Sequence, residues 1–256
     1  MVRHVVKMSA FTARVRNALR KTRAGLRLGG ENVSPEVPND LFRAHESIYH
    51  FAGTLAAGLR VLDIGCGSGY GSSILRAAGA AHVVGVDIDR RNVAYARRRF
   101  GSDRISFQVG DAADVVLDDP FDVIVASNML EHLVEIETVL PRIISFLGRD
   151  GMLIAALPPI TDERSLADNQ ANPYHRTNLY VADWYRLLAT HFSAVRLFAH
   201  HGPDGHVLDF DAPFTSSVDP RAFRFPETSL GDFPNSPSLT AVFVAAHPRE
   251  PVDSRR

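Results

Sequence analysis

A carboxylate followed by closely spaced glycines stands out in the stretch VLDIGCGSGYGSS, residues 61–73. Asp63 precedes Gly65, Gly67 and Gly69, and all four come directly after an apolar run that is typical of a strand. Glycine lets the backbone adopt positive φ values and lets a ligand approach the main chain closely. The spacing therefore predicts a ligand-binding turn between a strand and a helix.

The kind of ligand depends on the charges around this turn. The dinucleotide fingerprint fails in both registers, because Tyr70 and Ser72 stand where its third small residue belongs. The phosphate loop is disfavoured too, since no lysine follows the glycines. A pyrophosphate would also face the Asp63 carboxylate, and like charges repel. A ligand that carries an ammonium group suits the turn better.

Two further carboxylates follow predicted strands. Asp87, in GVDID, lies twenty residues after Gly67, where a carboxylate can accept both ribose hydroxyls, a feature shared with nicotinamide cofactor sites. Asp111, in VGDAAD, follows the next apolar run. Ligands of open α/β sheets bind at the carboxyl ends of the strands. We therefore expect these acids to share one site with the glycine turn.

With these residues the sequence resembles the class I S-adenosylmethionine-dependent methyltransferases, whose first motif is D-x-G-x-G-x-G. The segments FDVIVASNMLEHL and LGRDGMLIAALPP resemble the fourth motif and the fifth strand of that family, and HESIYHF resembles the segment before the first strand in small-molecule and glycan methyltransferases. The resemblance implies S-adenosyl-L-methionine as cofactor and S-adenosyl-L-homocysteine as product. It also implies a set of cofactor-binding residues: Tyr49, Asp63, Gly65, Gly67, Gly69, Asp87, Ile88, Asp111, Ala112, Ser127 and Asn128.

Two histidines are candidates for the chemistry. A hydroxyl acceptor must lose its proton during methyl transfer, and histidine is the usual base near neutral pH. His132 follows the fourth predicted strand and His175 the fifth, in segments that commonly form the acceptor pocket of the family. Alternatively, His132 packs at a helix start and His175 fixes the turn around Pro173. Glu131 either orients one of the rings or is solvated.

The segment HHGPDGHVLDFD, residues 200–211, is rich in histidine and aspartate. Gly-Pro and Asp-Gly turns account for much of this composition, and the segment lacks an established metal-ligand spacing. The sequence therefore predicts no metal site. Cys66, inside the glycine turn, is expected to be a small buried filler.

The elements that must position these residues alternate along the chain. Strands are expected at 59–64, 82–88, 104–109, 121–126, 151–157, 194–200 and 239–246, and helices at 69–78, 90–99, 138–147 and 180–190, with another helical pattern after the linker 32–40. Alternation with continuous apolar strands predicts a parallel sheet covered on both faces. The last two strands have no helix between them, which suggests an antiparallel hairpin at the sheet edge. The expected fold class is α/β, a Rossmann-like doubly wound seven-stranded sheet, mostly parallel with an antiparallel last strand, plus N-terminal helices.

Residues 1–30 carry many basic side chains and no acid. Apolar residues at helical spacing predict a basic amphipathic helix over 9–28, which could rest on the domain or make peripheral contact with anionic lipid or an acidic partner. We place a basic helix and linker at 1–38 and a methyltransferase domain at 39–256. Within that domain, the Pro/Phe-rich insert at 202–237 is expected to be a lid or an oligomer contact, as in a homodimer.

Composition narrows the class of protein. The chain has 256 residues, 45% hydrophobic and 22% charged, and a net charge of −1, so its overall charge gives no case for a nucleic-acid partner. One cysteine, no apolar run of membrane-spanning length and no signal-peptide pattern make the cytoplasm the expected location.

The expected activity is methyl transfer from S-adenosylmethionine to a small-molecule or glycan acceptor, at a hydroxyl, by in-line displacement. A methyltransferase-fold protein that binds without turnover is the first alternative. An NAD-dependent oxidoreductase is the second, and the missing third glycine of the dinucleotide fingerprint argues against it.

Overall fold

The computed structural model describes residues 33, 35–118, 120–210 and 215–249. The predicted basic helix at 9–28 lies outside the described residues, so its role and the boundary at residue 38 stay predictions. Among the described residues, no helix is both long and apolar enough to cross a membrane.

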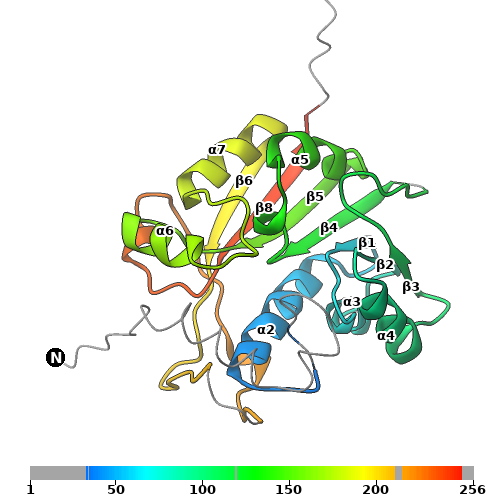
Figure 1. The fold of residues 1–256 in the computed structure, drawn as a ribbon, viewed down its shortest axis with the longest axis horizontal. Helices are drawn as coiled ribbons and strands as arrows, with labels where there is room; N and C mark the ends of the chain where they lie inside the picture. The colour runs from blue at the N-terminus through cyan, green and yellow to red at the C-terminus, as the bar shows by residue number, and fades with distance from the viewer. Residues whose placement is uncertain (1–32, 34, 119, 211–214, 250–256) are drawn as a thin grey trace, which may run out of the picture.

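One mixed sheet of eight strands organises the chain, in the order β3-β2-β1-β4-β5-β8-β6-β7 (Figure 1). Its strands are β1 Arg60–Ile64, β2 His82–Asp87, β3 Ile105–Val109, β4 Phe121–Ser127, β5 Leu147–Leu157, β6 Phe192–Ala199, β7 Glu227–Thr228 and β8 Ala241–Pro248. The first five strands pair in parallel, whereas β8 is antiparallel to both of its neighbours. The predicted α/β class with an antiparallel last strand is confirmed.

One detail of the predicted sheet is corrected. The sheet has an eighth strand, the two-residue β7, because part of the insert pairs with β6 at the edge. β6 and β8 pair antiparallel, as predicted, and lie toward this edge of the sheet, with β8 between β5 and β6. An apolar strand such as β8, buried over its first five residues, is most stable with a neighbour on each side and both faces covered.

Helices cover both faces of the sheet. They are α2 Asp40–Leu55, α3 Tyr70–Ala77, α4 Arg90–Phe100, α5 Ile136–Ile144, α6 Glu163–Gln170 and α7 Val181–His191, with 3₁₀ turns η2 Leu130–His132, η3 Pro220–Ala222 and η4 Phe233–Asn235. Neighbouring strand residues point to opposite faces: Val61 packs in the cluster that contains α2, α3 and α4, and Leu62 in the cluster that contains α5 and α7. Figure 1 shows these two helix layers on either side of the strands.

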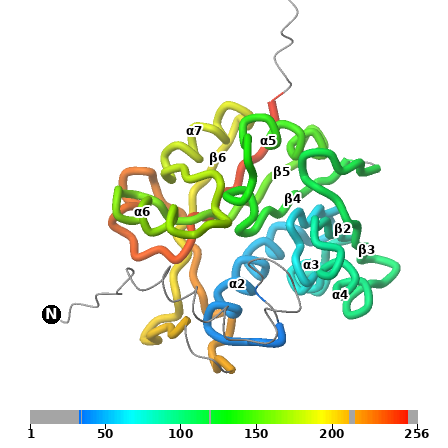
Figure 2. The backbone as a smooth tube through the Cα atoms, in the orientation of Figure 1, coloured from blue at the N-terminus to red at the C-terminus, as the bar shows by residue number. Residues whose placement is uncertain are grey.

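The insert at 202–237 packs against α2 and β6 over the part that is described. Val218 and Phe223 are buried in a cluster with Ala44 of α2, and the two segments run side by side in Figure 2. The ring of Phe225 stacks between Phe51 of α2, at 4.7 Å, and His200, also at 4.7 Å between ring centroids. The insert is thus part of the domain core, and its predicted role as a lid or an oligomer contact stays a prediction.

Candidate functional site

The glycine turn leaves β1 at its carboxyl end and enters α3. Gly65, Gly67 and Gly69 all have positive φ, at 75°, 52° and 82°. A Cβ on Gly65 would lie 2.4 Å from Cγ of Met129, so this turn also needs glycine for space. The amides of Gly65 and Cys66 donate to the Val86 carbonyl at 2.8 and 2.9 Å, which fixes the turn to β2. Cys66 is buried, as predicted.

Asp63 lies beneath this turn with 0% of its surface exposed. The Tyr49 hydroxyl donates to one carboxylate oxygen at 3.1 Å and the Ser72 hydroxyl to the other at 2.6 Å. Burial raises the pKa of Asp63 to about 6. A Cβ on Gly71 would fall 2.2 Å from the Tyr49 ring, so that glycine makes room for the tyrosine. The carboxylate therefore links α2 to α3. That it also binds the ammonium group of a ligand stays a prediction.

Asp87 ends β2 and reaches back to the glycine turn. Its carboxylate accepts from the amide of Gly67 at 2.8 Å, from the amide of Asp89 at 2.8 Å and from Nδ2 of Asn92 at 3.4 Å. Burial raises the pKa of Asp87. Beside it, Ile88 exposes 67% of its surface, which is unusual for a large apolar side chain and leaves it available to a planar ring.

Asp111 and Ala112 follow β3 at the same edge of the sheet. The Asp111 carboxylate accepts from the amide of Ala113 at 2.9 Å, and its carbonyl accepts from the amide of Val115 at 2.7 Å, so the turn is fixed locally. Ala112 is buried in the hydrophobic cluster that contains α5 and α7.

Ser127 ends β4, which is the neighbour of β1 in the sheet, and Asn128 follows it. Asn128 has a positive φ of 50°, and its side-chain nitrogen Nδ2 lies 3.4 Å from Nδ1 of His45 on α2. Burial lowers the pKa of His45 to about 4, so this ring is neutral at neutral pH. The parallel strands β1 to β4 thus bring the predicted cofactor residues to one edge, which is where open α/β sheets bind ligands.

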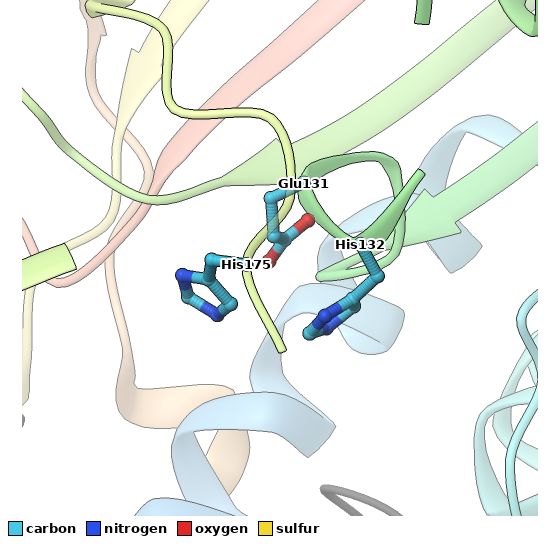
Figure 3. Close-up of side chains that lie close together, drawn as sticks. All are labelled: Glu131, His132 and His175. Carbon is cyan, nitrogen blue, oxygen red and sulfur yellow. The ribbon is translucent and has the colours of Figure 1, made fainter. Parts of the chain in front are cut away.

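His132 and His175 meet although they are distant in the sequence. Their ring centroids lie 5.1 Å apart, and both rings are partly buried. Figure 3 shows them beside Glu131, with His132 and Glu131 on η2 and His175 on the segment after α6. One potential ligand atom from each of the three residues lies within 4.8 Å of the other two. Burial and the neighbouring His132 lower the pKa of His175 to about 4.

Each of these imidazoles is oriented by a hydrogen bond at Nδ1. Nδ1 of His132 lies 3.0 Å from the Tyr174 carbonyl oxygen, and Nδ1 of His175 lies 2.6 Å from Oδ1 of Asn169. Because a carbonyl oxygen only accepts, Nδ1 carries the hydrogen in both of these bonds, which in a neutral imidazole leaves the lone pair on Nε2. The main chain holds the two segments together, since the Glu131 carbonyl accepts from the amides of Arg176 and Thr177 at 2.8 and 2.9 Å.

The described residues of the 200–211 segment form no cluster of potential metal ligands like that of Glu131, His132 and His175. His200 is buried with Nε2 2.9 Å from the Ser47 hydroxyl, and the ring of His201 hydrogen-bonds to Ser236. Asp204 pairs with Arg224 at 2.6 Å. His201 thus ties the insert to the end of β6, whereas the pair of Asp204 and Arg224 joins two parts of the insert.

Sequence reasoning missed the residues that support the site. Ser72 and Asn92 bind the two predicted carboxylates, and Asn169 orients His175. Polar residues in the first turn of the helix after a strand-end motif are a signal that could have identified Ser72 and Asn92. Nothing in the sequence around Asn169 points to His175, because the contact depends on α6, a short and mostly polar helix.

Comparison with known proteins decides the family. A family model described as "Methyltransferase domain" matches residues 55–191. This chain belongs to the methyltransferase family. The predicted class I S-adenosylmethionine-dependent methyltransferase is confirmed, with S-adenosyl-L-methionine as the cofactor of the family.

Individual members of the family differ in what they methylate. A probable S-adenosylmethionine-dependent methyltransferase of Mycolicibacterium smegmatis is 32% identical over 65% of this chain and 65% of its own length. A malonyl-[acyl-carrier protein] O-methyltransferase of Bacillus cytotoxicus is 27% identical over 48% of this chain and 42% of its own length. The N-methyltransferase NodS of Bradyrhizobium japonicum, solved with S-adenosyl-L-homocysteine, shares the fold with a TM-score of 0.58 at 16% identity, over 93% of this chain and 98% of that chain.

Proposed function

We propose that this methyltransferase transfers the methyl group of S-adenosylmethionine to a hydroxyl of a small-molecule or glycan acceptor. In this reaction an oxygen lone pair of the acceptor forms a bond to the methyl carbon. The bond between that carbon and sulfur breaks, its electron pair stays on sulfur, and S-adenosyl-L-homocysteine leaves. The hydroxyl proton passes to an imidazole of the site or to solvent.

The donor half of the proposal is supported by the edge formed by β1 to β4. Asp87, Ile88 and Asp111 follow adjacent strands there, and the glycine turn is held to Asp87 by the Gly67 amide at 2.8 Å. We assign the cofactor to this edge, with the nucleoside beside Asp87 and Ile88 and the methionine end toward Ser127 and Asn128.

The acceptor half is supported by one observation above all: the rings of His132 and His175, on the segments that follow β4 and β5, lie 5.1 Å apart, and each is oriented by a hydrogen bond at Nδ1. A hydroxyl is a weak nucleophile that loses its proton as it is methylated, and a neutral imidazole beside it can take that proton. We therefore favour oxygen as the acceptor atom and a direct or indirect role of both imidazoles in activating it.

The cytoplasm is the compartment that we propose for this activity. Cys66 is a buried free thiol, and the sequence has no second cysteine with which it could pair. A chain that does not depend on disulfides suits a reducing compartment.

A labelled-methyl assay on the full chain tests the proposed function. S-adenosyl-L-homocysteine is first titrated by calorimetry, and the enzyme is then given methyl-labelled S-adenosylmethionine with methyl glycosides, hydroxybenzoates or primary amines of similar size. We expect saturable binding of the product and label in an ether of a hydroxyl acceptor. Label found only in amines would overturn the assignment to oxygen, and failure to bind S-adenosyl-L-homocysteine would overturn the whole proposal.

A further inference from the structure

The cluster of Glu131, His132 and His175 has the chemical composition of a metal site. Two imidazole nitrogens and one carboxylate oxygen lie within 4.8 Å of one another, contributed by two separate segments (Figure 3). In a tetrahedral site with bonds of about 2.1 Å, ligand atoms lie about 3.4 Å apart. A shift of roughly 1.4 Å in side-chain position would therefore bring this cluster to bonding distance.

The hydrogen bonds around the two rings match those of metal-binding histidines. Such a histidine almost always donates its other ring N–H to a carbonyl or carboxylate, which fixes the tautomer and the ring orientation. Here Nδ1 of His132 donates to the Tyr174 carbonyl, and Nδ1 of His175 donates to Oδ1 of Asn169. Nδ2 of Asn169 in turn donates to Oδ1 of Asn178 at 2.7 Å, so the orienting amide is itself held in place.

The third member of the cluster supplies negative charge. Glu131 has 2% of its surface exposed, and a carboxylate that is removed from water is stabilised by a nearby cation. Its main chain is anchored by the amides of Arg176 and Thr177, and the Thr177 hydroxyl donates to the Leu133 carbonyl at 2.7 Å. The two segments that carry the ligands are therefore fixed to each other before a metal binds.

We propose that Glu131, His132 and His175 bind one divalent transition-metal cation, of the zinc or cobalt type. Nitrogen ligands favour these metals over magnesium and calcium, which prefer oxygen alone. Three protein ligands leave at least one coordination position open, as in catalytic and not in structural zinc sites.

The open position has a consequence for the acceptor, and this step rests on the proposed function. A bound cation lowers the pKa of an oxygen that it ligates, so an acceptor hydroxyl would be activated by the metal. The imidazoles would then act on the acceptor through the cation, and the hydroxyl proton would pass to solvent. This replaces the direct general-base role that the sequence suggests for His132.

Metal binding by the full chain, measured without any acceptor, tests the site. The chain is stripped with a chelator and titrated by calorimetry with zinc, cobalt and magnesium chlorides, and the visible absorption of the cobalt form is recorded. We expect one zinc or cobalt ion per chain, weaker magnesium binding, and a cobalt spectrum that is typical of nitrogen and oxygen ligands in four- or five-fold coordination.

Variants test whether Glu131 and His175, and not other residues of the chain, bind the metal. His175→Ala and Glu131→Gln should weaken zinc binding by at least about 100-fold, beyond the 10–100-fold cost of losing an orienting partner. The control is His191→Ala. His191 ends α7 directly before β6, at the opposite end of the strands from the cluster, so this variant should bind zinc like the wild type. Unchanged melting temperature and affinity for S-adenosyl-L-homocysteine would show that the variants are folded and that the donor site is intact.

Two results would overturn the metal site while leaving the proposed methyl transfer standing. One is the absence of stoichiometric zinc or cobalt binding by a chain that binds S-adenosyl-L-homocysteine normally. The other is zinc binding that His175→Ala and Glu131→Gln do not weaken relative to His191→Ala. Conversely, if the metal binds as expected but S-adenosyl-L-homocysteine does not, the proposed function fails and the metal site stands.

Discussion

The amide of Gly67 donates to the carboxylate of Asp87 at 2.8 Å, across twenty residues of sequence. The turn after β1 and the acid after β2 are therefore one structural unit, in which the position of the carboxylate and the path of the glycine backbone depend on each other. The same carboxylate also accepts from the amide of Asp89 at 2.8 Å.

Asp87→Ala should weaken binding of S-adenosyl-L-homocysteine by about 1–3 kcal/mol, the range for a lost hydrogen-bond acceptor that carries charge. Calorimetric titration measures this loss. Asp103→Ala, an exposed acid in the turn before β3, is the matched control and should leave the affinity unchanged. Equal affinities for the two variants would contradict the placement of the nucleoside beside Asp87.

Gly69→Ala should destabilise the fold more than Gly58→Ala. Both positions have positive φ, 82° and 77°, so alanine is strained at each by about 1–2 kcal/mol. At Gly69, however, a Cβ would also lie 2.6 Å from Cβ of Ala96, whereas at Gly58 it would meet no atom within 4 Å. Urea unfolding of both variants isolates the cost of the close contact, and identical losses of stability would refute it.

Asp63 should make the fold less stable as the pH rises through the mildly acidic range. Burial raises its folded-state pKa to about 6, above the value near 4 of an unfolded chain. The folded state therefore binds the proton more tightly, and this contribution to stability is present below about pH 4 and is lost by about pH 6. The loss from this group is roughly 2–3 kcal/mol.

The variant Asp63→Asn isolates that titration. It carries a constant penalty for the altered hydrogen bonds to Tyr49 and Ser72 but lacks the proton. Measured by urea unfolding at pH 4.5 and pH 7.5, the stability of wild type relative to the variant should fall at the higher pH. Parallel pH profiles of the two proteins would show that the Asp63 pKa is not raised.

His132→Ala should lower turnover by roughly 10²–10⁴, the range for losing a group that activates the acceptor proton. Binding of S-adenosyl-L-homocysteine should be unchanged, because His132 is not among the residues to which we assign the cofactor. Single-turnover rates with labelled donor measure the effect, and His191→Ala serves as the control. A rate close to that of the wild type would remove His132 from the chemistry.

Much of the donor side could be predicted because its residues are local to strand ends. Asp87 and Asp111 follow apolar runs, and parallel pairing of β1, β2 and β3 then places both acids at the edge with the glycine turn. The burial of Asp63 was not evident from the sequence, since it results from Tyr49 and Ser72 closing over it from two helices.

The remaining features depend on contacts between distant segments. The position of β8 between β5 and β6 depends on pairing energies that strand composition does not reveal. The meeting of His132 with His175 requires the path of the chain through α6, whose sequence ERSLADNQ has few apolar residues. Because α6 has no strong apolar face, the capping box between Asp162 and Ser165 is what stabilises its first turn.

The stacking of Phe225 between Phe51 and His200 couples the insert mechanically to α2. Since α2 also carries Tyr49, which donates a hydrogen bond to the acid beneath the glycine turn, the insert and the donor site share one supporting helix. The insert is therefore a structural support of the donor half of the protein, and a substitution that removes the Phe225 ring would loosen the helix that holds Asp63 in place.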